Sequence, residues 1–350
     1  MPPSPYPVAV APMLDWTDRH FRYVLRLVSP SVRLYTEMIT TGALLRGDAA
    51  RHLAFDPAEH PVALQLGGSE PEALARCARL GEEAGYDEIN LNLGCPSDRV
   101  REGRFGACLM AEPRRVADCV AAMKAAVAVP VTVKTRIGID ERDSYEELAA
   151  FVDGLRAAGL DALIVHARKA WLQGLSPREN REIPPLDYER VYRLKREFAE
   201  LPVTINGGIT TAEEVETHLR YVDGVMIGRA VCQDPWLLAR IERRRGGDVP
   251  ASPEVVVRRL LPYLERELAR GTPLARITRP LLGFFHGVPG ARRWRRMLSE
   301  GAHSPGAGPE LVEAALAAVA PAVRADQQVV EIRSGSQSKT AEKARLTRSQ

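Results

Sequence analysis

A single cysteine follows a predicted strand in a setting that suits a reactive thiol. Residues 88–92 alternate apolar side chains like a short strand, and Gly94-Cys95-Pro96 then ends it. Because proline cannot continue a sheet ladder and glycine permits a sharp turn, we expect the thiol on a stiff bend at the strand's C-terminal end. Cysteine is also among the most buried residue types, so a purely structural role is the alternative. The asparagines and the Gly-Pro frame favour a catalytic role.

Residues able to do chemistry also stand at the ends of most other predicted strands. They are Met13, Gln65, Asn92, Lys134, His166, Asn206-Gly207-Gly208 and Gly228-Arg229. Each one alone is as compatible with a rim or core position as with catalysis. Their joint placement after successive strands predicts that they share one rim.

Two of these strand ends are typical of a phosphate site. Asn206-Gly207-Gly208 and Gly228-Arg229 are both glycine turns that lead toward a helix. Bare backbone N–H groups at helix N-termini bind phosphate, and Arg229 would add a charge-assisted contact. We therefore expect a phosphorylated ligand. Glycines that serve only as turns are the alternative.

The elements that must position these residues repeat one unit along the first 240 residues. Eight β-rich apolar runs can be counted, at residues 8–11, 34–36, 62–66, 88–92, 131–134, 162–166, 203–206 and 224–227. Amphipathic stretches with helix punctuation separate most of them, which predicts parallel βα units. Eight units favour a closed (β/α)8 TIM barrel, whose active site lies at the C-terminal ends of the strands. An open doubly wound sheet is the alternative, but no glycine-rich dinucleotide fingerprint follows the first run.

The composition argues against several classes of protein, namely membrane, secreted, disulfide-rich and metal-binding proteins. The 350 residues are 45% hydrophobic and 27% charged, with a net charge of +3. No apolar run reaches the roughly 18 residues that span a bilayer, and the N-terminus lacks the layout of a signal peptide, so we expect no membrane contact and a cytoplasmic location. The five cysteines never form a C-x-x-C pair, so neither a disulfide framework nor a metal site is expected.

The remainder of the chain reads as a helical, basic region. After the catalytic barrel of residues 1–240, we expect a small all-helical domain over 241–330 and a disordered tail over 331–350. Residues 241–300 hold 13 basic residues, all Arg, against 6 acidic ones. Helices are predicted at 252–270, 273–285, 290–299 and 309–323. Such a basic region predicts a polyanion contact, with a solvated helical face as the alternative.

The chain resembles the tRNA-dihydrouridine synthases, which are flavin mononucleotide (FMN) enzymes. The resemblance covers roughly residues 7–325 and is carried by Ala11-Pro12-Met13 and by residues 63–67, 90–96, 134–136, 166–168, 206–208 and 227–230. The stretch around Cys95 is the most specific of these. Further stretches resemble the A subfamily, which acts on uridines 20 and 20a of the tRNA D loop, namely residues 16–20, 35–38, 96–100, 106–110, 176–181 and 289–292.

The resemblance implies a cofactor, a reductant and a set of catalytic residues. NADPH would reduce FMN, which would deliver hydride to C6 of the uracil, and Cys95 would donate the proton to C5. An ordinary cysteine thiol is protonated at neutral pH, as this role requires. Lys134 and His166 would assist catalysis. The implied FMN-binding residues are Pro12, Met13, Gln65, Lys134, His166, Asn206, Gly207, Gly208, Gly228 and Arg229.

The implied macromolecular partner is tRNA, with no protein partner indicated. A stacked uridine cannot enter a barrel, so it must be flipped out at a cost of a few kcal/mol. The residues expected to contact the tRNA are Asn92, Arg178, Arg181, Arg292 and Arg295. Trp294 and Phe284-Phe285 accompany the basic residues, either as RNA contacts or as the core of the helical domain.

Two other functions are compatible with parts of the pattern. A flavin barrel that reduces a free pyrimidine or another small enone, as dihydroorotate dehydrogenases do, would use the phosphate loops and Lys134 but leave the basic helical region idle. A non-catalytic RNA-binding barrel would use that region but leave Cys95, Lys134 and His166 without a purpose.

Overall fold

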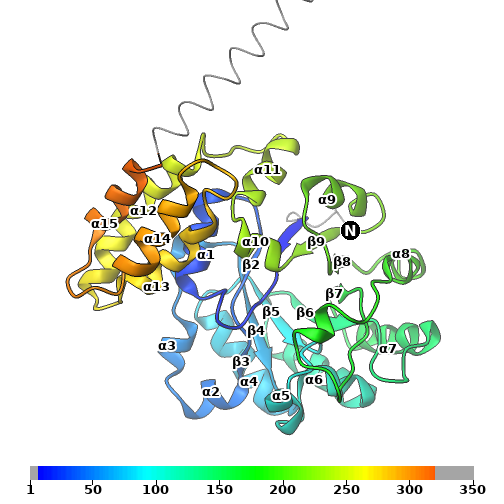
Figure 1. The fold of residues 1–350 in the computed structure, drawn as a ribbon. Helices are drawn as coiled ribbons and strands as arrows, with labels where there is room; N and C mark the ends of the chain where they lie inside the picture. The colour runs from blue at the N-terminus through cyan, green and yellow to red at the C-terminus, as the bar shows by residue number, and fades with distance from the viewer. Residues whose placement is uncertain (1–6, 320–350) are drawn as a thin grey trace, which may run out of the picture. The chain divides into compact units, whose positions relative to one another are not determined.

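Nine short parallel strands form one sheet in the computed structural model, which describes residues 7–319 (Figure 1). They are β1 (Val8–Val10), β2 (Leu34–Tyr35), β3 (Ile39–Thr40), β4 (Val62–Gly67), β5 (Glu88–Asn92), β6 (Val131–Arg136), β7 (Ala162–His166), β8 (Val203–Asn206) and β9 (Gly224–Ile227). The order is β1-β9-β8-β7-β6-β5-β4-β2, with β3 also on β4. Arg33 closes the ring, since its carbonyl accepts from Val10 N at 2.9 Å and its N–H donates to Val8 O at 3.0 Å. The predicted (β/α)8 TIM barrel is confirmed.

The second strand of the barrel is split by a bulge. Tyr35 pairs with Ala63, and Ile39 pairs with Leu66, so β2 and β3 advance four residues while β4 advances three. The extra residue bends the strand between β2 and β3, where Thr36 Oγ1 accepts from the backbone N–H of Gln65 at 3.0 Å. The bulge therefore holds the backbone of Gln65 beside the rim.

Helices surround the sheet, and local sequence sets where they start. Figure 1 shows α4, α6, α7 and α8 outside the strands. The helices of this part are α1 (Arg19–Val28), α2 (Thr41–Arg46), α3 (Ala49–Leu53), α4 (Pro71–Glu83), α5 (Asp98–Glu102), α6 (Pro113–Ala126), α7 (Tyr145–Ala157), α8 (Tyr188–Glu197), α9 (Ala212–His218), α10 (Arg229–Gln233) and α11 (Leu237–Arg244), with 3-10 turns at Pro57–Glu59, Gly106–Ala111 and Glu179–Arg181. Capping boxes at Ser144 and Thr211 satisfy free N–H groups of α7 and α9.

Alternate side chains along each strand point outward to the helices or into the barrel, so the first part of the chain has two cores. Outward residues such as Leu64, Ile89 and Leu91 are fully buried beneath the helices. Inside the barrel, small and apolar residues from several strands form one cluster, made of Ala9, Ala11, Tyr35, Ala63, Ile164 and Met226, with Met13 packed against it. The interior is thus apolar on one side, while β5 and β6 face it with polar residues.

The chain divides into two compact units, the first ending at Val249 and the second beginning at Pro250. The predicted boundary at residue 240 is wrong, because it cuts α11, which packs on α1 and α9 of the first unit. The predicted tail, 331–350, and the end of the helix predicted over 309–323 lie outside the described residues.

Within its described residues, the second unit is helical. It contains α12 (Pro253–Ala269), α13 (Leu274–Thr278), α14 (Ala291–Gly301) and α15 (Pro309–Ala317). The single helix predicted over 273–285 is instead α13 followed by a 3-10 turn at Arg279–Gly283, since Pro280 lacks the N–H that would continue the helix. Trp294 is fully buried and its indole N–H donates to Leu281 O at 2.7 Å, so this aromatic residue belongs to the core. No helix within residues 7–319 is long and apolar enough to cross a membrane.

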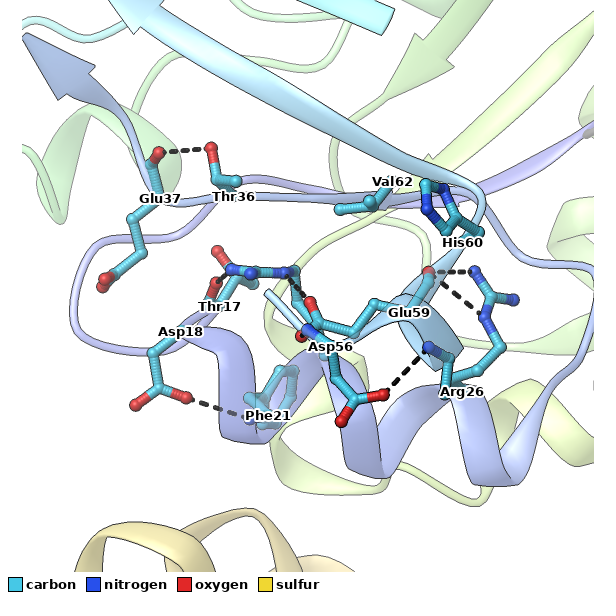
Figure 2. A network of polar contacts seen from close by, with 12 residues as sticks. Thr17, Asp18, Phe21, Arg26, Thr36, Glu37, Asp56, Glu59, His60 and Val62 are labelled. Atoms are coloured by element: carbon cyan, nitrogen blue, oxygen red, sulfur yellow. Dashed lines mark hydrogen bonds and ion pairs between the residues drawn. The ribbon is translucent and has the colours of Figure 1, made fainter. Parts of the chain in front are cut away.

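A buried ion pair anchors the loop between β1 and α1, and Figure 2 labels two of the residues involved, Glu59 and Thr17. Arg22 Nε lies 2.6 Å from Glu59 Oε2, with side-chain exposures of 5% and 0%, and its guanidinium also donates to Thr17 O at 2.8 Å. Thr17 Oγ1 in turn accepts from Met13 N at 3.0 Å. The ion pair therefore holds the segment that carries Met13 onto the rim.

We expect Glu59→Gln to destabilise the protein by about 3 kcal/mol, because it leaves the buried Arg22 charge without its carboxylate. Urea unfolding measures the change. Asp153→Asn is the matched control, since Asp153 pairs with Arg156 where both side chains are 57% exposed, and it should cost less than about 0.5 kcal/mol. Equal losses in the two variants would contradict this account.

Candidate active site

The C-terminal ends of five neighbouring strands bring buried polar side chains together. Gln65, Asn92, Lys134, His166 and Asn206 come from β4 to β8 and are each at most 9% exposed. Register pairs Asn92 with Lys134 and His166 with Asn206. Lys134 Nζ donates to Asn206 Oδ1 at 3.1 Å. These five sequence-predicted residues therefore lie around one rim.

The turn that carries Cys95 is held at every backbone polar atom of Gly94 and Cys95. Both N–H groups donate to Asn92 Oδ1, at 3.1 and 3.0 Å. The Gly94 carbonyl accepts from Arg136 Nε at 2.9 Å, and the Cys95 carbonyl accepts from Ala107 N at 3.0 Å. The half-buried thiol itself lies 3.5 Å from Ser97 Oγ. A thiol on so constrained a turn has a defined direction.

Three cationic or ionisable side chains beside this turn are buried together. Burial, with the positive charge of Arg136, lowers the pKa of the Lys134 ammonium to about 7. Burial likewise lowers the pKa of Arg136 to about 10. For His166, burial and the charges of Arg136 and Lys134 hold the pKa well below its usual range. Such a cluster is suited to an anion or to polarised carbonyl oxygens, which would offset the cost of burying positive charge.

Arg136 also joins the Cys95 turn to the long loop after β7. Besides the carbonyl of Gly94, its guanidinium donates to the carbonyls of Lys169 and Asn180, at 3.0 and 2.9 Å. The buried side chain of Asn180 closes that loop through hydrogen bonds with both backbone polar groups of Trp171. The loop is therefore anchored by the same residue that orients the thiol.

Further arginines extend the positive charge along this loop and onto α10. A negative charge on the Cys95 sulfur raises the pKa of Arg181, as it does those of Lys134 and Arg136. Within the described residues, the buried Nε of Arg168 has no hydrogen-bond partner, so it is available to a ligand. Arg229 is half exposed and pairs with Glu182 at 2.7 Å.

The glycine turn after β8 packs its backbone closely against His166 and Leu186. Gly207 and Gly208 have φ angles of 118° and 73°, which favour glycine. A Cβ on Gly207 would lie 2.7 Å from His166 Cδ2, and one on Gly208 would lie 2.8 Å from Tyr188 Oη. Side chains here would therefore displace the residues that form the rim.

Comparison with known proteins identifies the family. The model for dihydrouridine synthases (Dus) matches residues 9–320. This chain belongs to the dihydrouridine synthase family. It is 59% identical over 313 residues to the tRNA-dihydrouridine(20/20a) synthase of Shewanella oneidensis, covering 89% of this chain and 93% of the relative. The Escherichia coli K12 relative of the same name is 60% identical over 315 residues, covering 89% and 91%. The Vibrio cholerae relative of that name is 58% identical over 315 residues, covering 89% and 96%.

A solved structure supports the fold. A 2-naphthoyl-CoA reductase in complex with 2-naphthoyl-CoA aligns with a TM-score of 0.53 at 12% identity, over 71% of this chain and 51% of that chain. At this identity the likeness concerns the barrel alone.

Dihydrouridine synthases are flavin-dependent, and the rim of this chain fits such a ligand. Lys134 Nζ contacts a neutral amide, Asn206 Oδ1, rather than a carboxylate, and His166 is buried near it. Arg168 has a free buried donor. The backbone of Gly207 and Gly208 lies close to His166 and Tyr188. The other expected ligand residues also reach this rim, since Pro12 and Met13 follow β1, and Gly228 and Arg229 follow β9.

The residues expected to contact tRNA fall into three places. Asn92 is 8% exposed and lies inside the barrel, where its amide oxygen is occupied by the Cys95 turn. Arg178 and Arg181 are exposed on the loop after β7. Arg292 and Arg295 are exposed on α14 of the second unit.

Sequence reasoning missed Asn90, Thr132 and Glu88 as site residues, and it gave Arg136 no role of its own. Asn90 lies in register with Gln65 and Arg136 with His166, while Glu88 and Thr132 lie on the same inward faces of β5 and β6. The signal was available, because polar residues at every second position of β5 and β6 must point to one face of the sheet. Among residues 7–319, no three His, Cys, Asp or Glu side chains are grouped to hold a metal ion.

The depressed pKa of Lys134 predicts how stability depends on pH. Between about pH 7 and the ordinary lysine value of 10.5, the unfolded chain binds a proton here that the folded chain does not. Stability of flavin-stripped protein should therefore rise with pH relative to Lys134→Met, by up to about 1.4 kcal/mol per pH unit. Urea unfolding of both proteins at pH 7, 8 and 9 measures the difference, and a difference independent of pH would mean that Lys134 is not titrating in this range.

Proposed function

We propose that this protein is an FMN-dependent tRNA-dihydrouridine(20/20a) synthase that uses NADPH as reductant. The observation that carries the proposal is the placement of Cys95 on a rigid turn beside Lys134, Arg136 and His166, at the rim where a TIM barrel binds its substrate. Relatives named tRNA-dihydrouridine(20/20a) synthase match 89% of the chain at 58–60% identity, which supports the same reaction.

The residues that would hold FMN lie at the C-terminal ends of β1, β4 and β6 to β9. Gly207, Gly208, Gly228 and Arg229 would bind the phosphate through backbone N–H groups and one guanidinium. The flavin ring and its carbonyl oxygens would be held by Pro12, Met13, Gln65, Lys134, His166 and Asn206. When bound and reduced by NADPH, FMN supplies the hydride for C6 of the uracil.

Cys95 would donate the proton that completes the reduction at C5. Loss of this proton leaves a thiolate, whose negative charge is stabilised by the nearby Arg136 guanidinium and favours protonation of Lys134. Because Arg136 also holds the carbonyl of Gly94, one guanidinium both orients the turn and offsets the charge that develops there. The thiol is then regenerated by a proton from solvent.

The tRNA would be held outside the barrel by arginines. Arg178 and Arg181 would contact the nucleotides around the flipped uridine, whereas Arg292 and Arg295 would bind other phosphates of the tRNA. Contacts of this kind offset the cost of unstacking the uridine. The proposal also places the enzyme in the cytoplasm with its tRNA.

Cys95→Ala tests the chemistry. The variant should bind FMN and accept electrons from NADPH as the wild type does, yet form dihydrouridine at least about a hundredfold more slowly, because no positioned acid remains. Single-turnover conversion of tRNA that lacks dihydrouridine measures the rate. Cys108→Ala, at another half-buried thiol, is the control and should keep the wild-type rate. Near wild-type conversion by Cys95→Ala would remove the proton-donor role.

Arg292→Ala/Arg295→Ala tests the role of the second unit. Removal of each phosphate-binding arginine should flatten the log–log salt dependence of tRNA affinity by about one unit, while reduction of FMN by NADPH stays unchanged. Filter binding over a range of salt measures the slope. Arg156→Ala/Arg196→Ala removes two exposed arginines from α7 and α8 and should leave the slope unchanged. An unchanged slope in the first double variant would show that tRNA is bound elsewhere, with Arg178 and Arg181 the next candidates.

A further inference from the structure

A continuous chain of side-chain hydrogen bonds crosses the barrel interior and ends at the Cys95 turn. The Glu88 carboxylate accepts from Thr132 Oγ1 at 2.5 Å, and Asn90 Nδ2 donates to that same hydroxyl at 2.8 Å. Gln65 Nε2 donates to Asn90 Oδ1 at 2.7 Å, and Asn92 Nδ2 donates to Gln65 Oε1 at 2.8 Å. Asn92 Oδ1 then accepts from Gly94 and Cys95.

The five side chains of this relay are buried and belong to three adjacent strands. Their exposed fractions are 4% for Glu88, 2% for Thr132, 0% for Asn90, 1% for Gln65 and 8% for Asn92. Parallel register places Gln65 opposite Asn90 and Asn90 opposite Thr132. Since a buried amide left without hydrogen-bond partners destabilises the fold, each link holds its neighbour in place.

The chemistry at both ends sets the direction of every link. Glu88 is ion-paired with Arg33 and also accepts from Tyr35 Oη at 2.7 Å, so its carboxylate acts only as an acceptor. Thr132 must therefore donate to it and accept from Asn90. At the other end, the N–H groups of Gly94 and Cys95 can only donate. A flipped amide anywhere between would place two donors or two acceptors face to face.

The amide oxygen of Asn92 is therefore fully used by hydrogen bonds from the turn. Two N–H groups occupy its amide oxygen, and Gln65 takes one of its two amide hydrogens. One amide hydrogen of Asn92 remains for a substrate. Gln65 likewise keeps one amide hydrogen and one lone pair for the flavin ring. The relay thus determines which polar group each of the two residues can offer.

We propose that Thr132 and Asn90 are positioning residues for the reaction, because the Glu88-anchored relay orients the Asn92 amide that fixes the Cys95 turn. The inference rests on the proposed function for the role of Cys95. Neither Thr132 nor Asn90 lies at the end of its strand, and both act through Asn92. Loss of the Thr132 hydroxyl removes the acceptor that orients Asn90, and the amides of Gln65 and Asn92 then lose their fixed direction.

Thr132→Val and Thr132→Ser separate the hydroxyl from the shape of the side chain. The valine is isosteric but cannot relay a hydrogen bond, whereas the serine can. We expect Thr132→Val to lower the single-turnover rate of dihydrouridine formation at least about tenfold, since small misplacements of a catalytic group reduce rates strongly. The KM for tRNA should change much less than this rate, because the exposed arginines that would bind the tRNA are unaltered. Thr132→Ser should recover most of the rate.

A second measurement does not depend on activity. Amide hydrogen exchange at Gly94 and Cys95 should accelerate several-fold in Thr132→Val, with or without FMN, because Asn92 no longer holds these N–H groups. Thr204→Val is the matched control, since Thr204 lies on β8, two residues before Asn206 and outside the relay. It should change neither the exchange at the turn nor the rate.

The outcomes distinguish this inference from the proposed function. Wild-type rate and unchanged exchange in Thr132→Val would overturn the relay while leaving the enzyme assignment intact. Equal impairment in Thr132→Ser and Thr132→Val would also overturn it, since the hydroxyl would then be irrelevant. If wild-type protein formed no dihydrouridine, the proposed function would fail, and the exchange data alone would decide whether the relay holds the turn.

Discussion

Polar groups enclosed by a barrel must satisfy one another, and much of the site follows from that constraint. β5 faces the interior with Glu88, Asn90 and Asn92, which a closed sheet removes from water. Polar side chains on β4 and β6 provide their partners, so residues distant in the sequence pair across the register. The polar side chains at the rim are thus held rigidly because their hydrogen-bond partners are buried inside the barrel.

The rim adds a second constraint, which is the burial of basic groups without carboxylate partners. Lys134, Arg136 and His166 are buried beside one another, and burial depresses the pKa of each. Their contacts in the protein are amides and carbonyl groups, such as Asn206 Oδ1 and Gly94 O. A site of this kind gains free energy when it binds an anion or polarised carbonyl groups, so the electrostatics of the free protein prepare it for its ligand.

The sequence by itself determined the fold class, the order of the strands and most of the rim. Those features depend on local signals, namely strand alternation, glycine and proline punctuation and helix caps, and parallel strands bring their C-terminal ends together whatever the details of packing. Local signals failed where packing decides. α11 stayed with the barrel past residue 240, and packing decided between the two roles open to Trp294, which lies in a core. The helix predicted over 273–285 is a different case, because the local signal of Pro280 interrupts it.

Only the tertiary structure decided how the polar residues are used. Glu88 and Thr132 are 44 residues apart, and Lys134 and Asn206 are 72 apart, so their contacts depend on strand register that no local pattern encodes. The direction in which Gln65 holds the Asn92 amide and the depressed pKa of Lys134 follow from that register and from burial. Both are properties of the closed barrel rather than of any segment within it.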